Sequence, residues 1–199
     1  MTAGTGGHAD VFEGLRQQVE ACTRCPLHDS RMQVVFGSGD PAADLFFVGE
    51  APGAEEDRSG MPFVGRSGRL LDRLLEGIGI SRQEVFISNV VKCRPPENRD
   101  PSSLEIETCS PYLERQAELV ETRVICSLGN FATRLLSGEK KGITQLHGVP
   151  REIRIGSLQT TLFPLFHPAA ALRSPSYASG LEEDFARIPE LLESAEVRS

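Results

Sequence analysis

Four short apolar runs, separated by helical patterns and by loops rich in glycine and proline, most constrain the fold of this 199-residue chain. The runs cover residues 45–48, 85–91, 123–128 and 161–166. Each has the length and composition of a buried strand, and strands that alternate with helices form a parallel sheet with helices on both faces. A chain of this length suffices for one such domain and is short for two. The sequence therefore predicts a single α/β domain.

Between these runs, apolar residues recur at helical spacing. The expected helices cover residues 11–22, 68–76, 103–109, 111–121, 130–136 and 184–196. Ser67 is expected to cap the second of these helices, and Ser81 to Glu84 has the sequence of a capping box. Residues 148–158 are interpreted as a small hairpin. Residues 93–101 contain three prolines and are expected to be irregular.

The first ten residues differ from the rest in composition. Residues 1–10 are rich in glycine and threonine and lack the basic-then-apolar order of a signal peptide. We interpret them as a disordered leader, followed by one folded domain over residues 11–199. No apolar run approaches the ~18–20 residues that span a bilayer. The expectation is a cytoplasmic protein that makes no membrane contact.

The net charge of −7 at pH 7 argues at first against a nucleic-acid partner. Acidic residues, however, are concentrated between residues 182 and 196, whereas basic residues recur beside the loops that follow the strands. The basic residues in question are Arg66, Arg69, Arg73, Lys92, Arg94, Arg99, Lys140, Lys141 and Arg173. A local basic face on an acidic protein is therefore compatible with the sequence.

Polar side chains stand at or near the carboxyl ends of three predicted strands. Glu50 lies in the Gly49-Glu-Ala-Pro-Gly53 loop, Asn89 near the end of the second strand, and His167 directly after the fourth. Each has an ordinary structural explanation: a strand-end turn, a buried amide that satisfies backbone groups, or the cap of a turn. The carboxyl ends of parallel strands share one edge of a sheet, however, and ligands bind there. The three side chains are therefore expected to meet in one pocket.

Four of the five cysteines suit a metal centre. Cys126 lies within a strand, where a free cysteine behaves as a small buried hydrophobe. The other four, in helix ends and loops, are Cys22, Cys25, Cys93 and Cys109. A protein without a signal peptide is not expected to form disulfides. Four thiolates can hold either one zinc ion or a [4Fe–4S] cluster, and their spacing leaves both alternatives open.

The motifs together resemble the family 4 uracil-DNA glycosylases, the iron–sulfur members of their superfamily. The matching motifs, in the family's order within residues 11–190, are Gly49-Glu-Ala-Pro-Gly53, Pro62-Phe-Val-Gly65, Asn89-Val-Val-Lys-Cys-Arg-Pro-Pro96 and His167-Pro-Ala-Ala-Ala-Leu-Arg173. The resemblance implies a single-domain three-layer α/β/α fold around a central four-stranded parallel sheet. It also implies a [4Fe–4S] cluster, rather than zinc, on Cys22, Cys25, Cys93 and Cys109.

The activity that this resemblance implies is DNA repair. Such an enzyme flips uracil out of DNA and hydrolyses its N-glycosidic bond, which leaves an abasic site. The base must be read outside the stack, in a pocket. The uracil-binding residues implied are Gly49, Glu50, Ala51, Phe63, Asn89 and His167.

Chemistry suggests a role for each of these side chains. The ring of Phe63 offers a face on which a pyrimidine stacks. The amide of Asn89, with a donor and an acceptor, pairs with O4 and N3–H of uracil and so discriminates against cytosine. His167 donates a hydrogen bond to O2 of the departing base, joined by backbone N–H groups of residues 49–51. Glu50 orients water or stabilises positive charge on the sugar.

The residue after Glu50 does not provide a general base. Other branches of the superfamily carry a water-activating Asp or Asn directly after the position of Glu50, whereas the family 4 enzymes usually have Gly. This chain has Ala51 there, which has no polar side chain. Glu50 and His167 are therefore the expected catalytic residues.

The DNA contacts are also carried over from the family. Leu172 and Arg173 are expected in the loop that fills the gap left by the flipped base. Ser67 and Gly68 could hold a phosphate at a helix N-terminus, or merely cap the helix. The 93–102 loop has no histidine, so we expect turnover rather than a covalent adduct.

The expected protein is a monofunctional monomer acting on single- or double-stranded uracil-containing DNA. A second hypothesis is a non-catalytic iron–sulfur module that only binds nucleic acid. Such a module would have no need to retain Glu50, Phe63, Asn89 and His167 together. A third, a phosphate-ester enzyme, lacks the supporting glycine-loop spacing.

Overall fold

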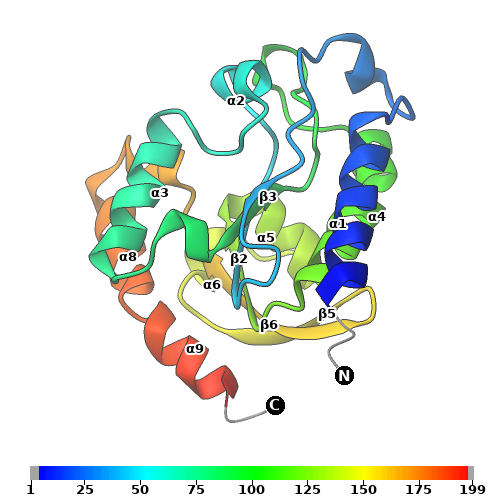
Figure 1. Ribbon diagram of the computed structural model, residues 1–199. Helices are drawn as coiled ribbons and strands as arrows, with labels where there is room; N and C mark the ends of the chain where they lie inside the picture. Colours follow the sequence, from blue (N-terminus) through cyan, green and yellow to red (C-terminus); the bar gives the residue numbers. More distant parts are fainter. Residues whose placement is uncertain (1–4, 197–199) are drawn as a thin grey trace.

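A six-stranded mixed sheet forms the centre of the computed structural model, which describes the backbone of residues 5–196 and the side chains of residues 7–195 (Figure 1). The strand order is β1-β3-β2-β4-β6-β5. The strands are β1 (Ser38–Gly39), β2 (Leu45–Gly49), β3 (Phe86–Asn89), β4 (Val124–Leu128), β5 (Arg151–Ile155) and β6 (Leu158–Leu165).

The middle of this sheet is parallel, as the sequence predicted. β3, β2, β4 and β6 are parallel neighbours, whereas β1 and β5 pair antiparallel at the two edges. The expected four-stranded sheet is therefore the central part of a larger, mixed one. β1 was not predicted because it has only two residues. One of them is Gly39, and both Gly39 (φ 115°) and the preceding Gly37 (φ 138°) have positive φ angles. The hairpin expected over residues 148–158 is formed by β5 and a longer β6.

Helices cover both faces of the sheet. The α-helices are α1 (Thr5–Glu20), α2 (Ala54–Ser59), α3 (Arg66–Gly77), α4 (Ser103–Val120), α5 (Gly129–Ser137), α6 (Ile143–Leu146), α7 (Pro168–Ala171), α8 (Pro175–Phe185) and α9 (Ile188–Glu196). Three short 3₁₀ helices are η1 (Pro26–Asp29), η2 (Arg82–Glu84) and η3 (Pro96–Asn98). None of the helices in the described part of the chain is both long and apolar enough to span a bilayer.

The alternation of side chains along β2 divides the core into two halves. Phe46 and Val48 join one buried cluster with residues of α1, α4 and α5, and Leu45 and Phe47 join another with residues of α3, α8 and α9. This is the period-2 pattern of a strand buried on both faces. In Figure 1, α1 and α4 accordingly lie side by side on one flank of the sheet and α3 and α8 on the other. The three-layer arrangement predicted from the sequence is confirmed.

Several element boundaries differ from expectation. α1 begins at Thr5, so residues 5–10 are helical rather than part of a disordered leader, and residues 1–4 of that leader lie outside the described residues. α3 is capped by Gly65, which places Ser67 inside the helix rather than at its N-cap. The expected C-terminal helix over residues 184–196 is two helices, α8 and α9. The capping box from Ser81 to Glu84 is confirmed.

One helix continues through a proline. We expected Pro111 to separate two helices, but α4 includes it in its middle. Proline removes the hydrogen bond to the carbonyl four residues earlier, here that of Glu107. Glu107 is exposed, so solvent can reach that carbonyl. The helix is also fixed at its start, where Ser102 and Glu105 form a capping box.

Candidate active site

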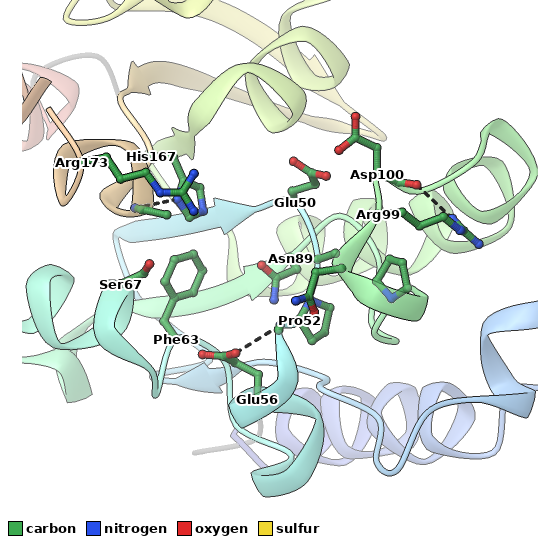
Figure 2. A pocket seen from close by; sticks show the side chains of 15 residues that line it. Glu50, Pro52, Glu56, Phe63, Ser67, Asn89, Arg99, Asp100, His167 and Arg173 are labelled. Atoms are coloured by element: carbon green, nitrogen blue, oxygen red, sulfur yellow. Dashed lines mark hydrogen bonds between the residues drawn. The ribbon is translucent and has the colours of Figure 1, made fainter.

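A cavity of about 540 Å³ opens at the carboxyl edge of the parallel strands, and side chains from distant parts of the sequence meet in it (Figure 2). The residues that line it are Glu50, Ala51, Pro52, Gly53, Glu56, Phe63, Ser67, Asn89, Pro95, Asn98, Arg99, Asp100, His167, Ala169 and Arg173. β2 ends before Glu50, β3 ends with Asn89, and His167 follows β6. The convergence expected from the strand ends is therefore present.

Gly49 lies next to the cavity, and its lack of a side chain lets Asn89 and Phe63 pack closely against its backbone. It pairs with Asn89 in the parallel register of β2 and β3. A Cβ atom at Gly49 would overlap the side-chain oxygen of Asn89 and would lie 2.7 Å from Cζ of Phe63. Only glycine fits between the amide and the ring. Asn89 itself is 2% exposed, so its amide is held in one place by the strands around it.

Phe63 is held in an unusual backbone conformation by neighbours that sequence reasoning missed. Its φ angle is 50°, which costs a non-glycine residue energy unless the surroundings enforce it. Arg82 donates to the carbonyl oxygens of Pro62 and Phe63, the latter at 3.1 Å, and pairs with Asp72 at 2.8 Å. Arg82 therefore clamps the loop that presents the ring.

Gly68, in the first turn of α3, packs directly against the backbone of the same loop. A Cβ atom there would overlap the carbonyl oxygen of Phe63, so glycine allows α3 to pack directly against the loop. Gly68 is buried and does not line the cavity. Gly68 is thus in contact with the backbone of Phe63 and not with the cavity.

His167 is poised as a neutral hydrogen-bond donor. Its Nδ1 accepts the backbone N–H of Ala169 at 3.0 Å, which assigns the proton of the neutral ring to Nε2. Burial lowers the pKa of His167 to about 4, and the negative charge of Glu56 opposes that shift only in part. The ring is therefore uncharged at neutral pH. It lies near Phe63, with ring centroids 5.8 Å apart at 31°.

Glu56 joins two loops of the site. One carboxylate oxygen accepts the N–H groups of Val64 and Gly65, both at 3.0 Å, and the other accepts that of Gly53 at 3.1 Å. Because these loops carry Glu50 and Phe63, the carboxylate of Glu56 fixes their separation. The acidic run at residues 55–57 is the only trace of this contact in the sequence, and it does not distinguish Glu56 from its neighbours.

Glu50 lies where two cavities meet. A second cavity of about 660 Å³ shares Glu50, Asp100 and His167 with the first and continues along α5. Burial raises the pKa of Glu50, and the charge of Asp100 raises it further. Asp100 was not predicted as a site residue, because it follows a proline-rich loop with no recognisable pattern. In Figure 2 it lies on the same side of the cavity as Glu50, opposite Phe63.

Comparison with known proteins accounts for this arrangement. A family model described as the uracil DNA glycosylase superfamily matches residues 36–191. The type-4 uracil-DNA glycosylase of Sulfurisphaera tokodaii is 44% identical over 187 residues, which cover 92% of this chain and 85% of the relative. That of Archaeoglobus fulgidus is 40% identical, covering 92% and 94%, and that of Thermotoga maritima 44%, covering 84% and 86%. The chain belongs to the type-4 branch of the uracil-DNA glycosylase superfamily.

The four cysteines of this type-4 family member come from three parts of the chain. Cys22 and Cys25 follow α1, Cys93 follows β3, and Cys109 lies in α4. Burial raises the pKa of Cys109, and the charges of Cys25 and Cys22 add to the shift. Burial likewise raises that of Cys93 to about 11, with contributions from Cys109 and Cys25. Cys109 therefore lies within electrostatic reach of the other three thiols.

Hydrogen-bond donors accompany these sulfur atoms. Arg31 donates to Sγ of Cys93 at 3.2 Å, and the backbone N–H of Lys92 donates to Sγ of Cys109 at 3.3 Å. At Cys22, burial raises the pKa, but hydrogen bonds from Tyr112 and Arg24 reverse the shift and lower it overall. Within the described residues, no group of three or more His, Cys, Asp or Glu side chains could hold a metal ion as placed.

Two of the four residues expected to contact DNA line the cavity. Ser67, in the first turn of α3, and Arg173, after α7, both border it. Leu172, next to Arg173, is 38% exposed. Gly68 is buried under the loop at Phe63, as described above.

Proposed function

We propose that this protein removes uracil from DNA by hydrolysing the N-glycosidic bond, which leaves an abasic site. The observation that carries the proposal is that Glu50, Phe63, Asn89 and His167 line one cavity. The names of the type-4 relatives support the same activity. The charge of the whole chain is unfavourable for DNA, but Arg173 borders the cavity; the guanidinium of Arg99, which also lines it, is paired with the carboxylate of Glu105.

Recognition of the base rests on a ring and an amide. The base stacks on Phe63, whose backbone is fixed by Arg82 and Gly68. The buried amide of Asn89 pairs with O4 and N3–H of uracil. Cytosine presents the opposite pattern of donor and acceptor at these two atoms, so it would leave the amide unsatisfied. Unpaired buried polar groups of this kind are costly, and they give strong discrimination.

Departure of the base requires stabilisation of negative charge on O2. The Nε2–H of neutral His167 supplies one donor, and backbone N–H groups of residues 49–51 supply others. Donors fixed in a water-excluding site are effective because they need not reorganise during the reaction. Losing one such donor typically costs on the order of 10²–10³ in rate.

Glu50 acts on the sugar side of the bond. Its carboxylate stabilises positive charge as the bond breaks and orients the attacking water. Ala51, the next residue, has no group for this task, so Glu50 is the ionisable side chain that we assign to it. The pKa of Glu50 is raised by burial and by Asp100, which favours proton uptake from water as the reaction proceeds.

The donor chemistry of the four cysteines suits an iron–sulfur cluster. Each thiolate of a [4Fe–4S] cluster binds a separate iron atom, so its ligands are spaced more widely than those of a single ion. We assign the cluster to Cys22, Cys25, Cys93 and Cys109, where Arg31 donates to Sγ of Cys93 and the backbone N–H of Lys92 to Sγ of Cys109. When bound, the cluster supplies a rigid cross-link between α1, α4 and the loop after β3.

The DNA is held around the mouth of the cavity. We assign a phosphate contact to Ser67 at the start of α3, and insertion into the duplex to Leu172 and Arg173; the other expected phosphate contact, Gly68, lies buried against the Phe63 loop and is not assigned one. The assignment of Leu172 and Arg173 is carried over from the family motif, and the 38% exposure of Leu172 is compatible with it. Monomeric state, cytoplasmic location and action on either single- or double-stranded DNA stay predictions.

A uracil-containing oligonucleotide tests the proposal. Incubation with purified protein that contains iron, followed by alkali, should break the strand at the uracil position, whereas the matched thymine and cytosine oligonucleotides should stay intact. Release of free uracil without strand breakage before alkali would establish a monofunctional enzyme. Binding of the oligonucleotide without breakage would instead favour the non-catalytic module.

A further inference from the structure

Lys92 is a buried lysine that the proposed chemistry does not use. Its side chain is among the largest that are fully buried, at 1% exposed. The ammonium group donates to the backbone carbonyl oxygen of Asn89 at 2.6 Å and to the hydroxyl oxygen of Ser88 at 2.8 Å. Burying an ammonium group is costly unless its hydrogen bonds are well made. Here both bonds go to the end of β3, where the amide of Asn89 enters the cavity.

The backbone of Lys92 is bound to one of the four cysteines. Its N–H donates to Sγ of Cys109 at 3.3 Å, and its carbonyl oxygen accepts the N–H of Val35 at 2.8 Å. The next residue, Cys93, receives a hydrogen bond from Arg31. One residue therefore contacts a cysteine through its backbone and the cavity strand through its side chain.

The intervening backbone is also bound to the active-site loop. The N–H groups of Val90 and Val91 donate to the carbonyl oxygens of Gly49, at 2.9 Å, and Glu50, at 3.1 Å. The side chain of Lys92 folds back along this turn and donates to the backbone carbonyl oxygen of Asn89, where the turn begins. Any displacement of Lys92 would be transmitted directly to the carbonyl of Asn89.

We propose that Lys92 is a positioning residue that holds Asn89 in register with its cavity and links that register to Cys109. This inference rests on the proposed function, because it assigns Asn89 the reading of uracil. The ammonium group itself lies on the backbone side of Asn89 and does not line the cavity. Its effect must therefore be specific to the base rather than to the DNA backbone.

The Lys92→Met variant tests the proposal, since methionine fills similar space without a donor. We expect iron content and visible absorption like those of the wild type, with affinity for free uracil about tenfold lower. Affinity for an oligonucleotide with an abasic site should stay within about twofold. The matched control is Ser88→Ala, which removes the other oxygen partner of the ammonium group and should leave uracil affinity within about threefold.

A double-mutant cycle separates positioning from general structural support. In the otherwise wild-type protein, Lys92→Met should slow uracil excision about tenfold. In the Asn89→Ala background it should have almost no further effect, because the amide that Lys92 positions is gone. An equal effect in both backgrounds, or equal weakening of uracil and abasic-DNA affinity, would overturn the proposal. If Lys92→Met fails to assemble with iron, Lys92→Gln, whose amide cannot reach the Asn89 carbonyl, serves in the same cycle.

The two proposals fail in different ways. A wild-type protein that breaks no uracil-containing strand counts against the proposed activity. The positioning role of Lys92 fails when the wild type is active and Lys92→Met retains wild-type affinity for uracil.

Discussion

At the scale of single residues, the site depends on side chains whose charge state or donor pattern is fixed by their surroundings. His167 is neutral because it is buried, and its proton is on Nε2 because Nδ1 accepts from Ala169. Asn89 is 2% exposed and lies against Gly49, where any side chain would collide with it. The side chains of His167 and Asn89 are therefore already oriented before a ligand binds, which reduces the entropy lost on binding.

The amide of Asn89 provides the first prediction. Asn89→Asp replaces a donor and an acceptor by a carboxylate that only accepts, so uracil release should fall about 100-fold or more. The same variant should gain measurable release of cytosine, whose amino group can donate to the carboxylate. Paired assays on uracil and cytosine oligonucleotides measure both effects. Asn98→Asp, the same change at an exposed position of the cavity wall, is the control, and unchanged uracil release in Asn89→Asp would remove Asn89 from recognition.

The depressed pKa of His167 predicts a pH effect on stability. The folded value is about 4, and the ordinary value for histidine is 6.5. Between these pH values the unfolded chain binds a proton that the folded protein does not, so stability falls as the pH is lowered through this window. His167→Asn lacks this titration. Urea unfolding at pH 7 and pH 5 should therefore show the wild type losing stability relative to the variant, and a constant difference would contradict the assignment.

At the scale of elements, the loops of the site are held by side chains that accept from or donate to their backbone groups. η2 supplies Arg82, which holds the loop of Phe63, and α2 supplies Glu56, which joins that loop to the one after β2. The strands determine where the loops begin. These two side chains then determine how the loops lie relative to one another.

Arg82→Met should release the strained loop at Phe63. Positive φ at a non-glycine residue costs of order 1–3 kcal/mol, and without the clamp the loop relaxes away from this conformation. We expect kcat/KM on uracil-containing DNA to fall about tenfold or more, measured under steady-state conditions. Asp72→Asn removes only the ion pair of Arg82 and leaves both carbonyl contacts, so it should retain most of the activity. Equal losses in the two variants would show that the ion pair, not the clamp, matters.

The elements that the sequence predicted are those with a local cause. The four central strands were predictable because apolar runs bounded by turns have few other uses, and Glu50, Asn89 and His167 were predictable because they follow those strands. Glu56 and Arg82 were missed because their partners are backbone groups of irregular loops, whose conformation no local sequence pattern predicts. The continuation of α4 through Pro111 was not predicted, because the cost of a proline within a helix is offset by tertiary packing that no local pattern reveals.

At the scale of the whole molecule, the proposed cluster would join parts that are distant in the sequence. Cys22 and Cys25 follow α1. Cys93 lies in the irregular segment between β3 and α4, and Cys109 lies within α4. Such a link constrains a chain segment of more than 80 residues in the unfolded state, where a cross-link has its largest effect.

Removal of iron should therefore destabilise the protein. After chelation under oxidising conditions, the midpoint of thermal unfolding should fall by about 5–10 °C, as followed by circular dichroism. The Cys126→Ala variant, which alters a buried cysteine within β4, should keep its iron and serve as the control. An unchanged midpoint after iron loss would contradict a structural role for the cluster.

The outer strand of the sheet has a consequence for behaviour at high concentration. β5 presents Arg151, Glu152 and Arg154 along an edge that would otherwise be open to a strand from another chain. Alternating charges on such an edge discourage strand addition, and the opposite edge offers only the two residues of β1. Neither side therefore provides a template for fibre growth, and concentrated samples should resist this form of aggregation even when partly unfolded elsewhere.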